Sequence, residues 1–355
     1  MSEPTRILVI RQDRLGDLLL TTPMIAALKE ALPHSHVTLM IQPQWYDAIR
    51  DNPHVDAVLP TEHKPRLTHY SRYVRLLRRR RYDAVILCKV NSGDHTWITW
   101  LSGIPVRVGT TDKYYGRLLT HNLRYGEELK SWHEVEFVTG LAQPLCPAPL
   151  TLQRVVLPIN ESALQQASLL LASKGVFDAE PYFCVHPGTG GTCHAWYPER
   201  YSQVAQKVRA RTGWTAVITG SQAEQPLASA VADQMQGKGV SIAGETSVQV
   251  LGAVLRRARL LISGDTAAVH VASSVGTPCV VVHPESDYAR RLRRWHPWMV
   301  PYRAVTATAF CPQCTEQECR MGGHICRESI TADAVVEAAL SLIQQEDLQA
   351  RADSS

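Results

Sequence analysis

The sequence lacks any long hydrophobic run. None of its apolar stretches reaches the roughly 18 residues that a membrane-spanning helix needs, which excludes such a helix. Residues 1–4 have neither the basic nor the apolar region of a secretory signal, so we expect a cytosolic protein. Hydrophobic residues make up 45% of the 355 residues, a share typical of globular proteins, which excludes bulk disorder.

Two phosphate-binding motifs are also missing. The segment after the first predicted strand, residues 6–10, has no G-x-G-x-x-G pattern, which counts against a nicotinamide-dependent enzyme, and the P-loop pattern G-x-x-x-x-G-K-[ST] does not occur. Lysine is scarce, since it supplies only 8 of the 37 basic residues and arginine supplies 29. Arginine suits phosphate and carboxylate partners, although a general compositional bias explains the excess equally well. The net charge of only +4 and the lack of a recognition motif argue against nucleic-acid binding.

The chain alternates short apolar runs with longer amphipathic ones, which predicts the parallel β–α–β units of an α/β fold. A stretch with several prolines, residues 146–180, divides two such series. We therefore expect two Rossmann-like domains with doubly wound parallel sheets, at 1–155 and 156–330, facing each other across a cleft. A last helix, 331–349, is expected to pack back on the N-terminal domain. The predicted strands are 6–10, 37–41, 55–59, 84–88 and 106–108 in the first half, and 182–185, 215–218, 260–262 and 279–282 in the second.

Ligands of open parallel sheets bind beyond the carboxyl ends of the strands, so the segments that follow strands are candidate sites. After the first strand, Gly16 permits a tight turn and Asp17 begins a helix. A carboxylate in this place can act as a general base on a hydroxyl group. The alternative is that Asp17 only caps the helix, a position that aspartate favours.

Three segments of the second half can bind a nucleotide. The glycine-rich loop 186–198 lets backbone amides approach a phosphate, unless it is only a tight turn. The helix that begins after Ser263-Gly264-Asp265 exposes unpaired amides and the positive end of its dipole, unless this start is merely capped. Glu224 can accept hydrogen bonds from ribose hydroxyls, or it only favours the dipole of its own helix.

Several short motifs follow one another along the chain. They are Ile7-Leu8-Val9-Ile10-Arg11, Leu15-Gly16-Asp17, Thr22-Pro23, His186-Pro187-Gly188-Thr189-Gly190-Gly191, Trp196-Tyr197-Pro198, Gly220-Ser221, Glu224, Ser263-Gly264-Asp265-Thr266, His270 and Gly276-Thr277-Pro278. In this order they resemble glycosyltransferase family nine, the bacterial lipopolysaccharide heptosyltransferases. The resemblance covers residues 5–345. It implies a GT-B fold, an ADP-heptose donor in the C-terminal domain, and a lipid A–core or other saccharide acceptor in the N-terminal domain. It further implies catalysis without a metal, in peripheral contact with the cytosolic face of the inner membrane.

The resemblance also implies roles for single residues. Asp17 would remove the proton of the acceptor hydroxyl, whose oxygen would displace ADP with inversion, and the amides of Thr266 and Ala267 would stabilise the leaving diphosphate. Family members often carry lysine where this chain has His194, which has less positive charge at neutral pH. The residues expected to bind the donor are Gly188, Thr189, Gly190, Thr192, His194, Glu224, Asp265, Thr266, Ala267 and His270, and those expected to bind the acceptor are Arg14, Gly16, Arg72 and Arg75.

Two basic clusters have no fixed role. Arg72 and Arg75 belong to a helical run, 70–81, that suits an anionic membrane surface or a phosphorylated lipid core, or that is simply a solvated helix face. A second cluster, Arg290–Arg294, faces either the donor or the acceptor in this interpretation.

Four cysteines are clustered near the C-terminal end. Their thiolates, within a short segment, could close a tetrahedral zinc or iron site with a structural role, while free thiols and disulfides are the alternatives. In a reducing cytosol a metal is favoured over disulfides. The four are Cys311, Cys314, Cys319 and Cys326.

Three other functions stay open. A relative of the autotransporter type would transfer heptose to protein side chains. A nucleotide-sugar epimerase of GT-B architecture would need further acid and base residues, which the sequence does not reveal. A nucleotide-binding scaffold without transferase activity is suggested by His194 in place of lysine.

Overall fold

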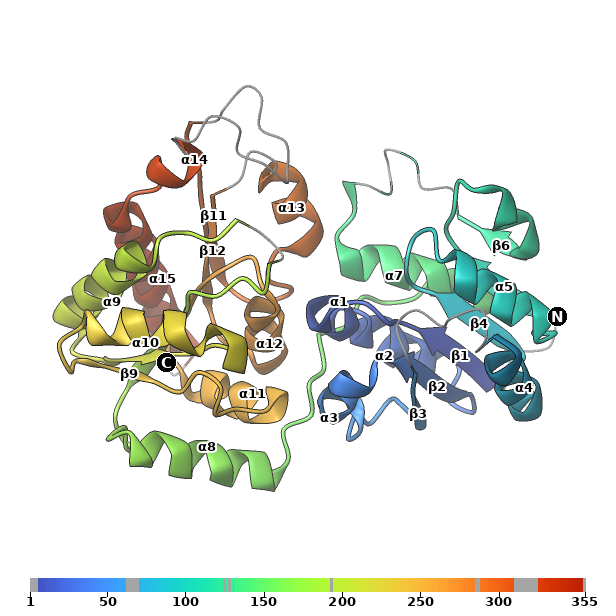
Figure 1. Ribbon diagram of the computed structural model, residues 1–355, viewed down its shortest axis with the longest axis horizontal. Helices are drawn as coiled ribbons and strands as arrows, with labels where there is room; N and C mark the ends of the chain where they lie inside the picture. Colours follow the sequence, from blue (N-terminus) through green and yellow to red (C-terminus); the bar gives the residue numbers. More distant parts are fainter. Residues whose placement is uncertain are drawn as a thin grey trace. The chain divides into compact units, whose positions relative to one another are not determined.

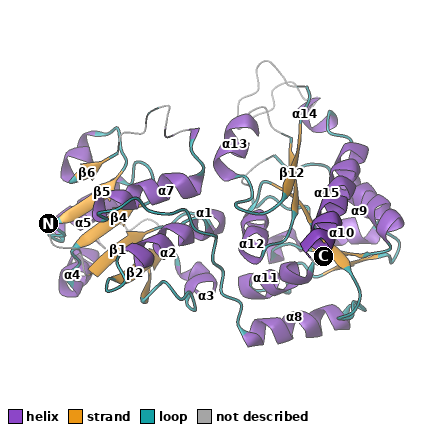
Figure 2. Cartoon of the chain, turned by 180° about the vertical axis from the view of Figure 1, so that it is seen from behind, coloured by secondary structure: helices purple, strands orange, loops and turns teal. Residues whose placement is uncertain are grey.

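The chain forms two units (Figure 1). Contacts divide it into Met1–Pro158 and Ile159–Ser355, slightly later than the sequence-based division at 155 and 156. Each unit has a six-stranded parallel sheet surrounded by helices, the arrangement expected for Rossmann-like α/β domains (Figure 2). The computed structural model describes residues 6–61, 70–123, 126, 129, 131–191, 194–284, 288–309 and 325–353.

The sheet of the first unit has the strand order β3-β2-β1-β4-β5-β6, and all neighbouring strands are parallel. Its central strand β1 pairs Val9 with Leu39 of β2 and with Ile86 of β4. The sequence pattern misses β6, because two residues are too few to form an apolar run. The strands are β1 (Arg6–Ile10), β2 (His36–Ile41), β3 (Ala57–Pro60), β4 (Ala84–Leu87), β5 (Val106–Gly109) and β6 (His121–Asn122).

Helices cover both faces of this sheet. On one face α4 packs on α5, and Leu77 of α4 and Ile98 of α5 share a core layer with Leu8 and Val85. Side chains alternate along a strand, so Ile7 and Val9 point to the other face, which is covered by the packed pair α2 and α7. The helices are α1 (Leu15–Leu19), α2 (Thr22–Ala31), α3 (Tyr46–Ile49), α4 (Tyr70–Arg80), α5 (Gly93–Leu101) and α7 (Glu134–Ala142), with 3₁₀ turns η1 (Pro43–Trp45), η3 (Tyr114–Leu118) and η4 (Gln143–Leu145).

The sequence predicts one helix from Leu18 to Ala31, but the structure has two. The hydroxyl of Thr21 donates to the carbonyl oxygen of Asp17, and Pro23 stands in the first turn of α2. A side chain that forms a hydrogen bond to the backbone competes with the hydrogen bonds of the helix. Proline has no N–H group to donate to the preceding turn, so it cannot continue a helix from that turn. The break makes α1 a short helix that immediately follows the segment after β1.

The sheet of the second unit has the order β12-β11-β10-β7-β8-β9, again all parallel. The sequence pattern misses β9 and β12, which have no fully buried residue. Helices α11 and α12 pack together, as do α9 and α10. The strands are β7 (Tyr182–His186), β8 (Thr215–Ile218), β9 (Gly239–Ser241), β10 (Leu261–Gly264), β11 (Cys279–His283) and β12 (Tyr302–Thr306). The helices are α8 (Glu161–Ser173), α9 (Pro198–Thr212), α10 (Gln225–Asp233), α11 (Val248–Arg257), α12 (Ala267–Val275), α13 (Tyr288–Trp295), α14 (Ile325–Glu328) and α15 (Ala332–Asp353), with the 3₁₀ turn η5 (Gln222–Glu224).

The last helix, α15, packs within the second unit. It contacts α9 and β12, and its residues Val335, Ala339 and Leu342 are fully buried in the core of this unit. The segment 331–349 is predicted to pack back on the N-terminal domain, and in the structure its apolar face packs on α9 and β12 of its own unit. Periodicity reveals that a helix has an apolar face but not which neighbour covers it. Within the described ranges, no helix has the length and apolar character needed to cross a membrane.

Candidate functional site

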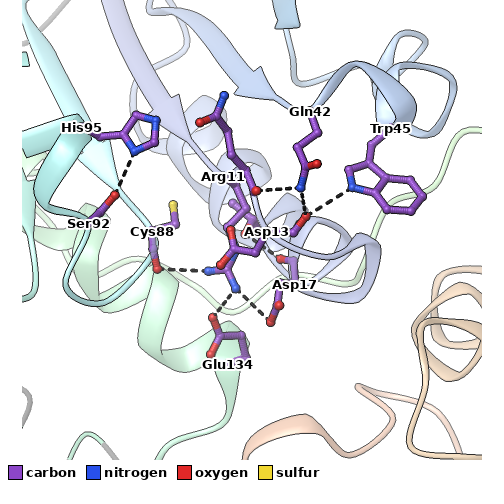
Figure 3. A network of polar contacts seen from close by, with 11 residues as sticks. Arg11, Asp13, Asp17, Gln42, Trp45, Cys88, Ser92, His95 and Glu134 are labelled. Carbon is purple, nitrogen blue, oxygen red and sulfur yellow. Dashed lines mark hydrogen bonds and ion pairs between the residues drawn. The ribbon is translucent and has the colours of Figure 1, made fainter. Parts of the chain in front are cut away.

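A buried arginine organises the end of β1. Arg11 follows this strand directly, and its side chain is only 3% exposed. Its Nη1 atom donates a hydrogen bond of 3.0 Å to the carbonyl oxygen of Cys88. Its Nη2 atom lies 2.9 Å from Oδ1 of Asp17 and 2.8 Å from Oε1 of Glu134 (Figure 3). Its Nε atom lies 3.4 Å from Oδ1 of Asp13, so one guanidinium contacts three carboxylates.

These carboxylates decide the charge of Arg11. Burial acts to lower the pKa of Arg11, but the three negative charges outweigh it, and the pKa is raised well above its ordinary value. Arg11 is therefore always a cation. Burial raises the pKa of the neighbouring Cys88 thiol to about 12, so this thiol stays neutral. The cluster thus combines one fixed positive charge with carboxylates from two different parts of the first unit.

Asp17 is the third residue of α1 and does not cap it. The N-cap position is occupied by Arg14, whose side chain makes no capping hydrogen bond. The carboxylate of Asp17 is instead held by Arg11, and its side chain keeps 20% of its surface exposed. The capping alternative for Asp17 is therefore wrong. The residue is fixed in orientation and still accessible, as a group that acts on a substrate must be.

Side chains from the connection between β2 and α3 hold the segment that carries Arg11, Asp13 and Asp17. The Nε2 atom of Gln42 donates hydrogen bonds to the carbonyl oxygens of Gln12, at 2.8 Å, and of Asp13, at 2.7 Å. The indole nitrogen of Trp45 donates to the same carbonyl of Asp13, at 3.3 Å (Figure 3). The backbone between β1 and α1 is therefore held by side-chain hydrogen bonds as well as by backbone hydrogen bonds.

Glu134 is a functional candidate that the sequence did not reveal. It is the first residue of α7 and only 2% exposed. A capping box fixes this helix start, because the His133 side chain accepts from the amide of Val135 and Glu136 accepts from the amide of His133. In the sequence, only the capping-box residues His133 and Glu136 mark the start of this helix. Nothing in the sequence connects Glu134 to Arg11, which lies far away along the chain.

The four residues expected to bind the acceptor have different surroundings. Gly16 is buried within α1 beside Asp17, and Arg14 is exposed at the start of that helix. Arg72 and Arg75 are exposed on α4, a helix that buries only Leu77. Their exposure agrees with a solvated helix face and equally with a surface available to an anionic partner.

In the second unit, the predicted nucleotide segments meet at one sheet edge. β7 is the first strand of this sheet, with β8 on one side and β10 on the other, so the order of strands reverses between β7 and β10. Ligands of such sheets bind at this reversal, beyond the carboxyl ends of the strands. The glycine-rich loop follows β7, and Asp265 and Thr266 follow β10. The loops after β7 and β10 therefore both lie next to the position where a ligand of this sheet is expected.

Glu224 fastens the glycine-rich loop to η5. Its Oε1 atom accepts a hydrogen bond from the amide of Gly190 at 3.0 Å, and its Oε2 atom accepts from the amide and the hydroxyl of Ser221 at 2.9 and 2.7 Å. A Cβ atom at Gly188 would lie 2.1 Å from Oε1 of this carboxylate, so a larger residue there would displace Glu224 from its bonds to the loop. Burial acts to raise the pKa of Glu224, but the hydrogen bonds from Ser221 and Gly190 and the nearby His186 lower it below its ordinary value.

His186, at the end of β7, supports the same carboxylate from inside the unit. Its Nδ1 atom lies 3.0 Å from the hydroxyl oxygen of Thr219, and its Nε2 atom lies 3.9 Å from Oε2 of Glu224. Burial lowers the pKa of His186, and the attraction of Glu224 only partly opposes this.

The start of α12 pairs an acid with a base. Asp265 is 7% exposed, and its Oδ2 atom lies 2.9 Å from Nε and 2.8 Å from Nη2 of Arg291 on α13. Arg291 belongs to the basic cluster Arg290–Arg294, for which the sequence predicts no particular partner. Thr266 occupies the N-cap with an extended backbone and no side-chain capping bond, because its hydroxyl lies 3.1 Å from that of Ser263. The first amides of α12 have no intrahelical acceptors and can meet an anion.

Comparison with known proteins decides the family. A family model described as glycosyltransferase family 9 (heptosyltransferase) matches residues 70–325, more than half of the chain. The chain belongs to this family. It is a glycosyltransferase, and a relative, lipopolysaccharide heptosyltransferase 3 of Escherichia coli, is 24% identical over 299 residues, which cover 80% of this chain and 83% of the relative.

Solved structures share the fold of this family 9 glycosyltransferase. A family 9 glycosyltransferase from Veillonella parvula superimposes with a TM-score of 0.81 at 22% identity, over 96% of this chain and 97% of the other. The ADP-heptose lipopolysaccharide heptosyltransferase II of Escherichia coli gives a TM-score of 0.75 at 20% identity, over 96% and 99%. The GT-B fold expected from the sequence, with two Rossmann-like units, is confirmed.

The remaining residues that are predicted to bind the donor differ in how deeply they are buried. Thr189 and His194 are half-buried in the loop after β7, and Ala267 is half-buried in the first turn of α12. His270, one turn later in α12, is 4% exposed and lies inside the unit. Thr192 lies outside the described residues.

The predicted metal site falls mostly outside the described part of the chain. Cys311, Cys314 and Cys319 are not among the described residues, and the zinc or iron site stays a prediction. Cys326 is described: it lies on α14, is 4% exposed and belongs to the hydrophobic core of the second unit.

Proposed function

We propose that this glycosyltransferase transfers a heptose from ADP-heptose to a hydroxyl group of an inner-core lipopolysaccharide saccharide. The observation that carries the proposal is the carboxylate of Asp17, held 2.9 Å from buried Arg11 at the carboxyl end of β1 and partly exposed. The names of two relatives support the choice of substrates, since one is a lipopolysaccharide heptosyltransferase and another an ADP-heptose lipopolysaccharide heptosyltransferase.

In the proposed reaction, Asp17 accepts the proton of the acceptor hydroxyl while its oxygen attacks the anomeric carbon of the heptose. The new carbon–oxygen bond forms as the bond from that carbon to the diphosphate breaks, so ADP leaves and the configuration is inverted. The proton ends on Asp17. Arg11 holds the carboxylate in one orientation, which a base needs for an in-line attack.

In the second unit, the donor binds at the loops that follow β7 and β10. The free amides at Thr266 and Ala267 and the dipole of α12 face the negative charge that grows on the leaving diphosphate. Glu224, which accepts from the amide of Gly190, holds the glycine-rich loop in the shape in which it borders the donor. His194 takes the place of a phosphate-binding lysine.

A lipid-borne acceptor requires contact with a membrane surface. In this proposal the enzyme works in the cytoplasm at the inner membrane, and the exposed arginines of α4, among them Arg72 and Arg75, meet anionic lipid or core phosphates.

The deciding experiment incubates the full chain with ADP-heptose and a lipopolysaccharide truncated in its inner core. Mass spectrometry should show one added heptose on the saccharide, with release of ADP. The Asp17→Asn variant should bind ADP within about twofold of wild type and lose about 10²–10⁴ in turnover, the usual contribution of a general base. Asp47→Asn, at an exposed aspartate of α3, is the matched control. Equal turnover of Asp17→Asn, or transfer only to protein, would contradict the proposal.

A further inference from the structure

Helix α5 presents large apolar side chains to solvent. At its end, Trp100 is 43% exposed and Leu101 is 39% exposed. Trp97 lies on the same side of the helix, because it precedes Trp100 by three residues, and it is half-buried. The two indole rings meet edge to face, with their centroids 5.8 Å apart. Single exposed apolar residues are ordinary, but a contiguous cluster of them indicates an interaction surface.

The 3₁₀ turn η3 extends this apolar face toward the start of α5. It packs on α5, and a Cβ atom at Gly93, one turn before Trp97, would lie only 3.2 Å from the ring of Tyr115. The ring of Tyr114 has its centroid 5.6 Å from that of Tyr115, and Tyr114 is 77% exposed. We call this face the aromatic strip. It consists of Trp97, Trp100, Leu101, Tyr114 and Tyr115.

Arginines of α4 border the aromatic strip. α4 packs on α5 (Figure 2), and Arg78 donates from Nε and Nη2 to the carbonyl oxygen of Leu101, at 3.2 and 2.8 Å. Arg75 is exposed one turn before Arg78, on the same flank of α4. The sequence of α4 has five arginines and no acidic residue. Asp94 of α5 is already engaged, because it accepts a hydrogen bond from the hydroxyl of Tyr70.

This combination of side chains favours an anionic lipid surface as the partner. Tryptophan and tyrosine have an apolar ring with a polar tip, so they prefer the boundary between water and lipid. Arginines beside them are attracted to anionic headgroups. A symmetric contact between two copies of the chain would instead bring the arginines of both α4 helices together, where like charges repel.

We propose that the aromatic strip docks the enzyme on an anionic bilayer, with Trp100 and Leu101 entering the lipid interface and the arginines of α4 meeting the headgroups. The inference rests on the proposed function, since a lipid-borne acceptor is what brings the enzyme to a bilayer. One part of the attachment is apolar and persists when salt screens the charges. The other part comes from the arginines and weakens as salt is raised.

The test measures flotation of the full chain with phosphatidylcholine vesicles that contain or lack phosphatidylglycerol, at low and at high salt. Wild type should bind the anionic vesicles and keep part of this binding at high salt. Trp100→Ser/Leu101→Ser should bind about tenfold more weakly at both salt concentrations, because apolar area no longer leaves water. Leu169→Ser/Phe177→Ser, a matched change at exposed apolar residues of the second unit, should bind like wild type.

Two further variants examine the same surface. Arg75→Gln/Arg79→Gln should weaken binding at low salt and have little effect at high salt, since it removes only charge attraction. Tyr114→Ser removes an exposed ring of η3 without altering α5, so it reports on the strip even if the double variant of α5 does not fold. It should weaken binding about threefold.

A parallel assay of heptose transfer to a delipidated, water-soluble core saccharide separates docking from catalysis. Trp100→Ser/Leu101→Ser should keep wild-type turnover on this acceptor and lose turnover on lipopolysaccharide in vesicles. Unchanged vesicle binding in the folded variant, or a wild type that transfers heptose without binding vesicles, would overturn the docking surface and leave the transferase in place. Vesicle binding that depends on the strip in a chain without transferase activity would support the surface and refute the proposed function. A dimer that this variant dissociates, without vesicle binding, would show that a second copy covers the strip and would overturn the proposal.

Discussion

Arg11 fixes Asp17 through a single nitrogen, Nη2, which lies 2.9 Å from Oδ1 of the aspartate. The same nitrogen lies 2.8 Å from the buried carboxylate of Glu134. The pair is therefore part of a cluster in which one cation compensates several anions, and removing the cation affects both folding and the orientation of the proposed base.

We expect Arg11→Met to destabilise the protein by about 3–5 kcal/mol, because Glu134 is left buried without a counter-charge. Urea denaturation measures the loss. The double variant Arg11→Met/Glu134→Gln should recover part of it, since the buried charge is then gone. The control is Lys207→Met, which removes an exposed ion pair with Asp333 and should change stability by less than about 1 kcal/mol. A loss for Arg11→Met no larger than that of the control would show that the cluster is not a buried ion network.

Gly188→Ala should disturb the loop after β7. The added Cβ would lie 2.1 Å from the carboxylate of Glu224, which must move and give up its bonds to Gly190 and Ser221. We expect a loss of about 1–3 kcal/mol in stability from the broken charged hydrogen bonds, and about tenfold weaker ADP binding by calorimetry. Gly126→Ala, where a Cβ would meet no atom of the described residues within 4 Å, is the control. Unchanged ADP affinity in Gly188→Ala would separate this loop from the donor.

His194→Lys should strengthen ADP binding by about three- to tenfold, because lysine is fully charged at neutral pH and histidine is not. The gain should shrink as salt is raised, since it comes from charge attraction. Calorimetry with ADP at two salt concentrations measures both effects. If the variant binds ADP no better than wild type, residue 194 does not meet a phosphate.

Stability should fall as the pH falls from 7 to 4, in part because of His283 at the end of β11. Burial, with repulsion from Arg291, lowers the pKa of His283 to about 4. The unfolded chain takes up this proton near the ordinary value of about 6.5 and the folded chain does not, so acid favours unfolding by up to about 3 kcal/mol. Denaturation of His283→Leu should show a flatter pH dependence in this window. His34→Leu, at an exposed histidine, should follow the wild type.

The fold could be predicted from the sequence because buried parallel strands are continuous apolar runs, as in Arg6–Ile10 and Cys279–His283. The misses have physical reasons. β6 is too short to form a run, β12 is only half-buried, and the break between α1 and α2 depends on a bond from Thr21 to the backbone. Hydrophobic periodicity therefore cannot reveal β6, β12 or the break between α1 and α2.

The site could be predicted only in part. Asp17 and Glu224 follow strands and are conspicuous by position. Their partners are not: Glu134 meets Arg11 because β1 and the start of α7 are brought together by the fold, and Arg291 meets Asp265 because α13 returns to the start of α12.

The burial of α15 has a consequence for how such enzymes can be recombined. Because Val335, Ala339 and Leu342 are buried in the core of residues 159–355, this unit takes its last core helix from its own end of the chain. A chimaera that exchanges residues 1–158 for the corresponding half of a relative should therefore leave the core of the second unit complete.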